Sequence, residues 1–351
     1  MIPTKLIEQV KLDFNNVNPS KSIHQDLSTA VFTSPDTLWV ASDEINAIER
    51  LKKVDGKTFG EHQSFHLSQL LNNFNDEEKE VDIEGMDYDG NYLWLIGSHS
   101  TKRKKAKLDN INRLQTIKQD KNRYLLARIP LVGDKLEKEA NNRQAAYLER
   151  NPFGTNQLIE VLKNDPYIGD ILSINLPGKD NGFDIEGLLV REETILIGLR
   201  GLVLRGIAII LEISVEEKEA GILSLKSINN EGQRYKKHFL DLDGLGVRDL
   251  CLDGEDVLIL AGPTMDLDGT LRVFRWQGAF GLPDKSFSVQ KEGTLATLFD
   301  IPYTSGSDRA EGLTLFPHAN AAKAVLVVYD SPDSKRIIEP AGVLADVFAW
   351  E

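Results

Sequence analysis

A short acidic phrase recurs along the chain, and its carboxylates are the side chains with the clearest capacity for chemistry. An acidic residue, an apolar residue, Glu and Gly occupy residues 82–85 and again 184–187, and a shorter copy, Ala-Glu-Gly, occupies 310–312. Side chains alternate along a strand, so the Asp and the Glu of one copy should face the same side. Several such carboxylates brought together would suit a hard divalent cation, which prefers oxygen ligands.

Rotation of these copies about one axis would gather their carboxylates in a single site. Like charges raise each other's pKa and destabilise the fold unless something compensates them. A divalent cation is one compensation, with Ca²⁺ as the first expectation and Mg²⁺ or Mn²⁺ as the alternatives. The candidate metal ligands are Asp82, Glu84, Asp184, Glu186, Asp249 and Glu311.

Arginine side chains are the other compensation, and they lead to an alternative without metal. Arg248 and Arg309 occupy the matching entry positions of the fourth and fifth units, and Arg200 follows the second strand of the third. In this alternative the carboxylates form a structural ring of ion pairs, and Glu-Gly is a device that builds the start of each unit. The repetition itself favours this interpretation, because catalysis rarely needs three equal copies.

A histidine and a basic stretch stand near the end of the second unit. His99 leads into the cationic residues 101–107. In an acidic chain such a stretch predicts an anionic ligand, although charge runs are often simply solvated and lone histidines are often structural. Hydrolysis would also need a proton acceptor, so the candidate catalytic residues are His99, Glu84 and Glu186. The candidate substrate-binding residues are Lys102, Arg103, Lys104, Lys105, Arg200, Arg248 and Arg309.

The same phrase indicates the fold, because each copy begins a strand that is followed by a second apolar strand. Two looser copies, at 27–41 and 247–260, share the strand pair without Glu-Gly. Five copies of one unit indicate a repeat architecture, and short β runs separated by Asp-Gly and Gly-Asn pairs indicate antiparallel strands. We therefore expect an all-β protein with a single β-propeller, most simply of five blades, or of six if the long second unit contains another.

Ring closure and one insertion complete the predicted architecture. The chain ends after the third strand of the fifth unit, at 343–350, while a strand at 8–14 precedes the first unit. Pairing of these two strands would close the ring and leave no open edge. The propeller domain should span 1–351, with a partly helical insertion in the second blade at 101–169 and a fourth strand of that blade at 171–176.

The composition limits the partners and the compartment. The 351 residues carry a formal net charge of −13, which argues against nucleic acid and against an anionic membrane surface as partners. The single cysteine, Cys251, excludes an internal disulfide framework. The N-terminus lacks the apolar region of a secretory signal, and no run of about 18 apolar residues predicts a membrane span. We expect a cytoplasmic protein with an anionic small molecule as partner, and a protein partner as the alternative.

Motifs spread over nearly the whole chain resemble the DUF3616 family, a family of unknown function. They lie at residues 82–85, 97–105, 122–128, 183–187, 198–201, 247–250, 260–266 and 309–312. More remotely, the Asp-x-Glu-Gly strand is similar to the phytase-like propeller esterases and other calcium-dependent propeller hydrolases. This resemblance implies a metal site centred on the channel, and it carries over no catalytic residue.

These features predict a metal-dependent hydrolase that acts on a phosphate ester or another anionic small molecule at the central channel face. The alternative is a non-catalytic scaffold that binds an anionic ligand or a protein loop, with its channel carboxylates neutralised by arginines. Glycoside hydrolysis by two channel carboxylates would need a pair roughly 5–10 Å apart. The basic stretch argues against that third interpretation.

Overall fold

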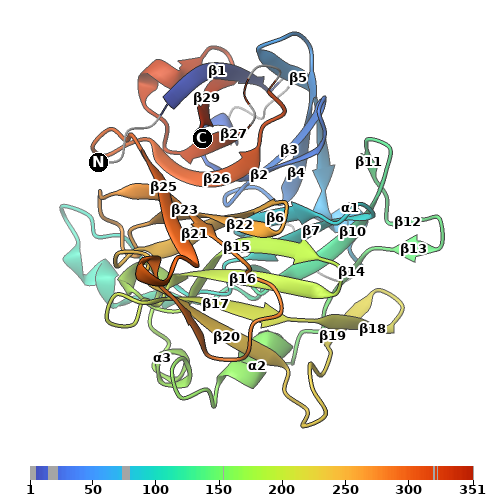
Figure 1. Ribbon diagram of the computed structural model, residues 1–351, viewed down its shortest axis with the longest axis vertical. Coiled ribbons are helices and arrows are strands. Elements are labelled where there is room, and N and C mark those ends of the chain that lie inside the picture. The colour runs from blue at the N-terminus through green and yellow to red at the C-terminus, as the bar shows by residue number, and fades with distance from the viewer. Residues whose placement is uncertain are drawn as a thin grey trace.

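The computed structural model describes residues 5–14, 23–72, 80–152, 154–318, 321 and 323–350. Residues 1–4, which belong to the N-terminal segment interpreted above as lacking a signal, lie outside these ranges, as does residue 351 of the predicted domain. Figure 1 shows small twisted sheets grouped around the inner strands β2, β6, β15, β21 and β26. No helix within the described ranges is long and apolar enough to cross a membrane.

The main strands form antiparallel groups of four, each counted here from its inner strand outward. The first group is β2 (Leu27–Ser34), β3 (Thr37–Ser42), β4 (Ala47–Lys53) and β5 (Thr58–His66). The second is β6 (Ile83–Tyr88), β7 (Tyr92–Gly97), β10 (Leu126–Val132) and β14 (Ala146–Leu148). The third is β15 (Asp184–Arg191), β16 (Thr194–Gly201), β17 (Ala208–Ile213) and β20 (Tyr235–Leu240). The fourth is β21 (Gly246–Asp253), β22 (Asp256–Gly262), β23 (Leu271–Trp276) and β25 (Leu295–Ile301). The fifth is β26 (Arg309–Leu315), β27 (Ala324–Asp330), β29 (Gly342–Ala349) and β1 (Lys5–Asp13).

Shorter elements decorate these groups. The helices are α1 (Leu67–Leu70), α2 (Gln157–Leu162) and α3 (Gly169–Ser173), with 3₁₀ turns η1 (Ile23–Gln25), η2 (Ile111–Gln115), η3 (Lys121–Arg123), η4 (Gly178–Asp180), η5 (Gln290–Glu292) and η6 (Ser334–Arg336). The short strands are β8 (Lys102–Arg103), β9 (Ile117–Lys118), β11 (Lys135–Leu136), β12 (Glu139–Ala140), β13 (Arg143–Gln144), β18 (Val215–Glu219), β19 (Ile222–Leu225), β24 (Ser286–Ser288) and β28 (Ile337–Ile338).

The N-terminal strand closes the ring. β1 pairs with β29 in antiparallel register from Lys5 opposite Ala349 to Asp13 opposite Gly342. The inner strands contact one another in a cycle that runs from β2 through β6, β15, β21 and β26 back to β2. An all-β propeller closed by its N-terminal strand is therefore confirmed. The number of five blades rests on this strand pairing alone.

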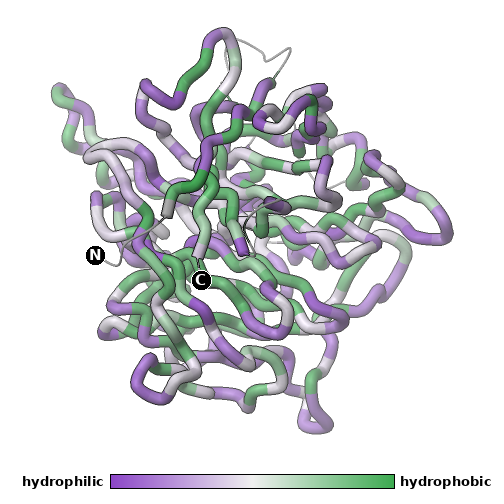
Figure 2. Tube along the Cα trace, turned by 45° about the horizontal axis from the view of Figure 1, so that its top comes forward, coloured by the Kyte–Doolittle hydropathy of each residue, from purple (hydrophilic) through white to green (hydrophobic). Residues whose placement is uncertain are grey.

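The hydrophobic core lies between neighbouring blades. One cluster joins the first and fifth blades through residues such as Val40 and Leu326, and another joins the third and fourth through Ile210 and Ile259. A blade has a neighbour on either side, so its middle strands are apolar on both faces, and β17 is buried along its whole length. Figure 2 shows hydrophobic residues concentrated along the strands and hydrophilic residues along many of the outer loops.

The second blade departs most from the prediction. Residues 171–176 were predicted as its fourth strand, but Ile171 and Leu172 belong to α3, and β14 occupies that place in the blade. A short apolar run does not distinguish a strand from a buried helix. Asn156 caps α2 by accepting from the amides of Leu158 and Ile159. The predicted insertion at 101–169 thus contains α2, the β8–β9 pair and two strands of the blade itself.

Candidate functional site

Each of the five inner strands skips one residue in its pairing with the second strand of the blade, at an equivalent place. A bulge leaves its extra residue unpaired and re-aims the side chain. Three of these residues, all glutamates, line one cavity, and an arginine among them contacts two of the glutamates. The bulge residues are Ser28, Glu84, Glu186, Arg248 and Glu311.

The glycine after each glutamate permits close approach of the neighbouring blade. A Cβ on Gly85 would lie 2.8 Å from the carbonyl oxygen of Glu186, and one on Gly312 would lie 2.9 Å from the Cα of Thr29. Neither glycine has a positive φ. The Glu-Gly pair therefore brings successive inner strands together and places their glutamates near one another.

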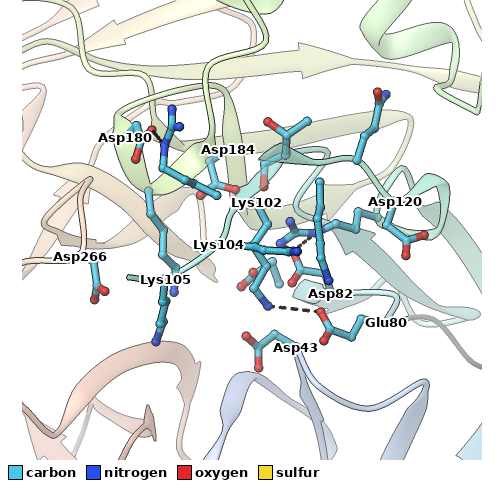
Figure 3. Close-up of a pocket in the computed structure, with 18 of the residues that line it drawn as sticks. Asp43, Glu80, Asp82, Lys102, Lys104, Lys105, Asp120, Asp180, Asp184 and Asp266 are labelled. Carbon is cyan, nitrogen blue, oxygen red and sulfur yellow. Dashed lines mark hydrogen bonds and ion pairs between the residues drawn. The ribbon is translucent and has the colours of Figure 1, made fainter. Parts of the chain in front are cut away.

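A cavity of about 1110 Å³ opens among these glutamates, and we call it the channel cavity. Its volume is slightly above the usual range for small-molecule sites. Figure 3 shows Asp43, Asp82 and Glu80 on one side of it, with Lys102 and Lys104 beside them and Lys105 toward Asp266. Its acidic lining is Asp43, Glu80, Asp82, Glu84, Asp120, Asp180, Asp184, Glu186, Asp266, Glu311 and Asp330, and its basic lining is Lys102, Arg103, Lys104, Lys105, Arg113, Lys118, Arg123, Lys179 and Arg200.

Arginines neutralise part of the acidic lining. Arg200 forms ion pairs with both Asp184 and Glu186, the two carboxylates of one copy of the phrase. Arg248 Nη1 lies 2.6 Å from Glu311 Oε1 and 3.6 Å from Glu186 Oε2. These pairs are buried, so each carboxylate would be costly without its partner. This half of the acidic lining matches the predicted alternative of arginine compensation.

The remaining carboxylates form a compact triad of Asp43, Asp82 and Glu84. One oxygen from each lies within 4.8 Å of the others. Asp82 also accepts from Arg123 Nε at 2.8 Å. Glu84 is only 9% exposed, and within the described ranges its carboxylate has no hydrogen bond or ion pair. Within the described part of the chain, Asp43 and Glu84 therefore have no cationic partner in direct contact, whereas Asp82 has Arg123.

The pKa shifts of the triad differ between Asp82, which has an arginine partner, and the two carboxyls that have none among the described residues. Burial disfavours the charged form of Asp82, but the Arg123 guanidinium and the Ser98 hydroxyl prevail and lower the pKa of its carboxyl. Burial raises the pKa of Glu84 well above its usual range, and the charges of Asp82 and Glu186 raise it further. Burial and the charge of Asp82 likewise raise the pKa of Asp43. A bound cation would relieve this unfavourable charge.

Part of the basic stretch lines the channel cavity. Lys102 Nζ lies 3.3 Å from Glu80, and Arg103 Nε lies 2.6 Å from Asp180. Lys104 and Lys105 also line the cavity, and neither has an ion pair with a described residue. The loop of the β8–β9 hairpin therefore places the ammonium groups of Lys104 and Lys105, which have no ion pairs with described residues, at the acidic channel cavity.

Two of the predicted substrate-binding arginines, Arg248 and Arg309, pair with acidic residues and lie outside the lining of the channel cavity. Arg309 lies 2.9 Å from Asp266 and 4.0 Å from Asp330, and Arg248 contacts Glu186 and Glu311. Neither of these arginines belongs to the residues that line the channel cavity. Arg200 does line it.

Asp249 is not brought to the other carboxylates. Arg248 takes the bulge position that Glu occupies elsewhere, and Asp249 accepts instead from the backbone amides of Leu250 at 2.8 Å and Leu313 at 2.7 Å. Its carboxylate thus links β21 to β26. The prediction that Asp249 is a metal ligand is therefore wrong, since its carboxylate does not line the channel cavity.

His99 faces a second, smaller cavity of about 290 Å³, which we call the insertion cavity. Its Nδ1 lies 2.8 Å from the carbonyl oxygen of Gly97, and Asn156 Nδ2 lies 2.7 Å from its Nε2. Burial lowers the pKa of His99 to about 4. The ring is therefore neutral and fully hydrogen-bonded, and it does not line the channel cavity, where a proton acceptor would have to act.

Asp43 and Arg123 are site residues to which the sequence analysis assigned no role. Asp43 follows the second strand of the first blade just as His99 follows that of the second, so the repeat offers a signal for it. Arg123 lies in η3, in the stretch where the repeat is interrupted. No pattern in the sequence marks its partnership with Asp82.

Comparisons with known proteins place the chain in a family. Residues 26–346 match the model described as "Protein of unknown function (DUF3616)", and the chain belongs to this family. Comparison with curated protein sequences found no match.

Similar solved structures are β-propeller proteins. They include an aldose sugar dehydrogenase from Streptomyces coelicolor at 10% identity and a TM-score of 0.43, covering 99% of this chain and 98% of that one. A streptogramin B lyase has 8% identity and a TM-score of 0.40, with 98% of each chain covered. A periplasmic gluconolactonase from Pseudomonas aeruginosa has 13% identity and a TM-score of 0.31, covering 92% of this chain and 88% of that one.

Proposed function

We propose that the protein is a divalent-cation-dependent hydrolase that acts on a phosphate ester, or on another small anionic molecule, in the channel cavity. The observation that carries the proposal is Glu84. Its carboxylate is nearly buried, lacks a partner among the described residues, and lies within 4.8 Å of oxygens from Asp43 and Asp82. A buried charge of this kind needs a cation or a proton.

The triad suits a hard cation. It offers carboxylate oxygens only, which are the ligands of Ca²⁺, Mg²⁺ and Mn²⁺. Ca²⁺ is the first candidate, because it accepts irregular oxygen sets more readily than Mg²⁺ does. When bound, such a cation polarises a phosphoryl oxygen and lowers the pKa of a bound water.

The cationic side chains around the triad suit an anionic substrate. Lys104 and Lys105 line the cavity without ion pairs to described residues, so they are available to phosphate oxygens. Arg123 holds Asp82 in place through its Nε. Glu311 also lines the cavity, and burial together with the charge of Asp330 raises its pKa to about 8. A carboxyl that titrates near neutral pH can accept a proton during hydrolysis, so Glu311 takes the role expected of His99, Glu84 or Glu186.

The second candidate function is a non-catalytic scaffold for an anionic ligand or a protein loop. It is favoured by the ion pairs of Asp184, Glu186 and Glu311 with Arg200 and Arg248. Three of the carboxylates predicted to bind metal are compensated in this way without a cation. The two functions share the cavity and differ in whether the triad binds metal and supports turnover.

Cation binding tests the proposal directly. Isothermal titration of Ca²⁺, Mg²⁺ and Mn²⁺ into chelator-treated protein should give near-stoichiometric binding. Glu84→Gln should lower the affinity at least about tenfold, because a carboxylate ligand is lost. Glu186→Gln is the matched control, since it changes the same bulge position on the next blade but removes an arginine-paired carboxylate.

Turnover then separates the two functions. Cation-dependent release of phosphate from p-nitrophenyl phosphate, abolished in Glu84→Gln, supports the hydrolase. Cation binding without turnover of any phosphate ester in a panel favours the scaffold. Absence of cation binding in the wild type overturns the metal site.

A further inference from the structure

The basic stretch continues beyond the channel cavity as a surface hairpin. We call residues 102–118, from the start of β8 to the end of β9, the basic hairpin. Its residues 102–106, 113, 114 and 118 line the channel cavity, whereas residues 107–112 do not. The basic hairpin therefore forms one continuous surface from the cavity outward.

Four large apolar side chains of the basic hairpin are exposed. Leu108 is fully exposed and Ile111 is 65% exposed, and Leu114 and Ile117 are exposed as well. None of these four belongs to a hydrophobic core cluster of the described residues. A 3₁₀ turn has three residues per turn, so Ile111 and Leu114 project from the same side of η2. Exposed apolar side chains gathered in one short segment indicate a surface that binds a partner.

Polar contacts hold the basic hairpin in shape without help from these side chains. Arg113 Nε donates to the carbonyl oxygen of Lys105 at 2.9 Å, and the amide of Lys104 donates to the carbonyl oxygen of Thr116 at 3.0 Å. Arg103 ties the hairpin to Asp180 on the next segment of the cavity wall. The apolar side chains are therefore free to contact a partner, and their replacement should leave the hairpin folded.

The charge of the basic hairpin selects an acidic partner. The hairpin carries seven cationic side chains and one carboxylate, a formal +6, and since the whole chain is −13 the rest carries −19. An acidic partner is thus attracted to the hairpin and repelled elsewhere. An anionic bilayer suits this surface less well, because an extended surface would also approach the acidic remainder of the chain. A short polypeptide segment with acidic and apolar side chains can contact the hairpin alone.

We propose that the substrate is a phosphate ester carried by a polypeptide, whose phosphate enters the channel cavity while the acidic and apolar residues beside it bind the basic hairpin. This inference rests on the proposed function, since it names the substrate class of the same site. In hydrolysis the oxygen of water bonds to phosphorus as the P–O bond to the serine or threonine side chain breaks. A proton from the water passes to the departing oxygen, which leaves inorganic phosphate and a free hydroxyl.

Non-hydrolysable phosphonates test this inference without any need for turnover. The probes are methylphosphonate and a short peptide rich in glutamate and leucine that contains one phosphonate analogue of phosphoserine. In calorimetric titrations with the preferred cation present, the phosphonate peptide should bind the wild type at least about tenfold more tightly, because it adds contacts with the basic hairpin. The same peptide with serine in place of the analogue measures binding to the hairpin without the phosphonate.

Loss of the exposed apolar side chains should remove this advantage. In Leu108→Ser combined with Ile111→Ser, the phosphonate peptide should approach the affinity of methylphosphonate, which itself should bind as in the wild type. Retained methylphosphonate binding also shows that the variant is folded. Val54→Ser is the matched control, since Val54 is an exposed apolar residue of the first blade that does not line the channel cavity. This variant should keep the wild-type advantage.

The outcomes separate this inference from the function on which it rests. Cation-dependent binding of both phosphonates with equal affinity overturns the polypeptide substrate and leaves the proposed function standing. Equal, cation-independent binding of the two peptides without binding of methylphosphonate overturns the proposed function, and with it the substrate class. Sedimentation with phosphatidylserine vesicles that Leu108→Ser and Ile111→Ser abolish, with no advantage for the phosphonate peptide, overturns the inference in favour of a membrane surface. An advantage that these two replacements remove and Val54→Ser retains supports it.

Discussion

Arg248 donates to Glu311 across 2.6 Å and so joins the inner strands of the fourth and fifth blades at the channel. Both residues occupy the bulge of their strand, and the same arginine nitrogen lies 3.6 Å from Glu186 on the third blade. One guanidinium therefore stands between two of the repeated glutamates. The substitution of Arg for Glu in one blade of the repeat compensates the charge that the repeat itself creates.

Removal of this guanidinium should destabilise the fold strongly. Arg248→Met should lower the free energy of unfolding by about 3–5 kcal/mol, because it leaves the buried carboxylate of Glu311 without its arginine partner and removes one of the two arginines beside Glu186. Urea denaturation followed by fluorescence measures the change. Arg248→Met combined with Glu311→Gln should recover part of the loss. A loss below about 1 kcal/mol in the single variant would mean that the pair behaves as a solvated ion pair.

The glycine of the repeated phrase should tolerate no side chain. A Cβ on Gly85 would meet the Glu186 carbonyl at 2.8 Å and Ile96 at 2.9 Å. Gly85→Ala should therefore cost about 1–3 kcal/mol of unfolding free energy through overpacking. Gly56→Ala is the control, because Gly56 has no neighbour within 4 Å and no positive φ. Equal stability of the two variants would show that the inner strands can separate without cost.

The repeat made the fold predictable, and the interruption of the repeat marks where the prediction ended. A strand pair that recurs five times requires neighbours to cover its apolar faces, and the spare strand at the N-terminus has one natural partner in β29. In the second blade the repeat is broken by residues 101–169. The apolar residues just after it, at 171–176, suited a strand as well as a helix. In the structure Ile171 and Leu172 lie in α3 and pack, partly buried, against the core cluster that the second and third blades share.

The sequence indicated which carboxylates gather at the site, but it did not indicate which of them pair with arginines. Residues on equivalent bulges must converge, so Glu84, Glu186 and Glu311 were found from the repeat. Which carboxylate meets an arginine depends on side-chain reach across blades, as with Arg123 and Asp82, which lie 41 positions apart in the chain. Asp249 stands one residue beyond its bulge and therefore faces the backbone of β26 rather than the channel.

The lysines of the β8–β9 hairpin should contribute affinity for anions. Replacement of both Lys104 and Lys105 by Ala should weaken methylphosphonate binding roughly tenfold or more at low salt. The difference should shrink as salt is added, because exposed charges are screened. Titration calorimetry at several ionic strengths measures it. Lys107→Ala is the control, since Lys107 is exposed on the same loop but does not line the cavity. Equal affinities across these variants would remove the loop from the site.

The neutral state of His99 should make stability depend on pH. Burial lowers the pKa of His99 to about 4, whereas an unfolded histidine titrates near 6.5. Between these values the unfolded chain binds more protons than the folded chain does, so the free energy of unfolding falls as the pH falls. From pH 7 to pH 5 this contribution amounts to about 2 kcal/mol. Urea denaturation at both pH values should show this loss in the wild type. In His99→Asn, whose amide is neutral and tolerates the positive φ at this position, the pH dependence should be smaller by that amount. An unchanged pH dependence in this variant would mean that the pKa of His99 is not lowered in the folded protein.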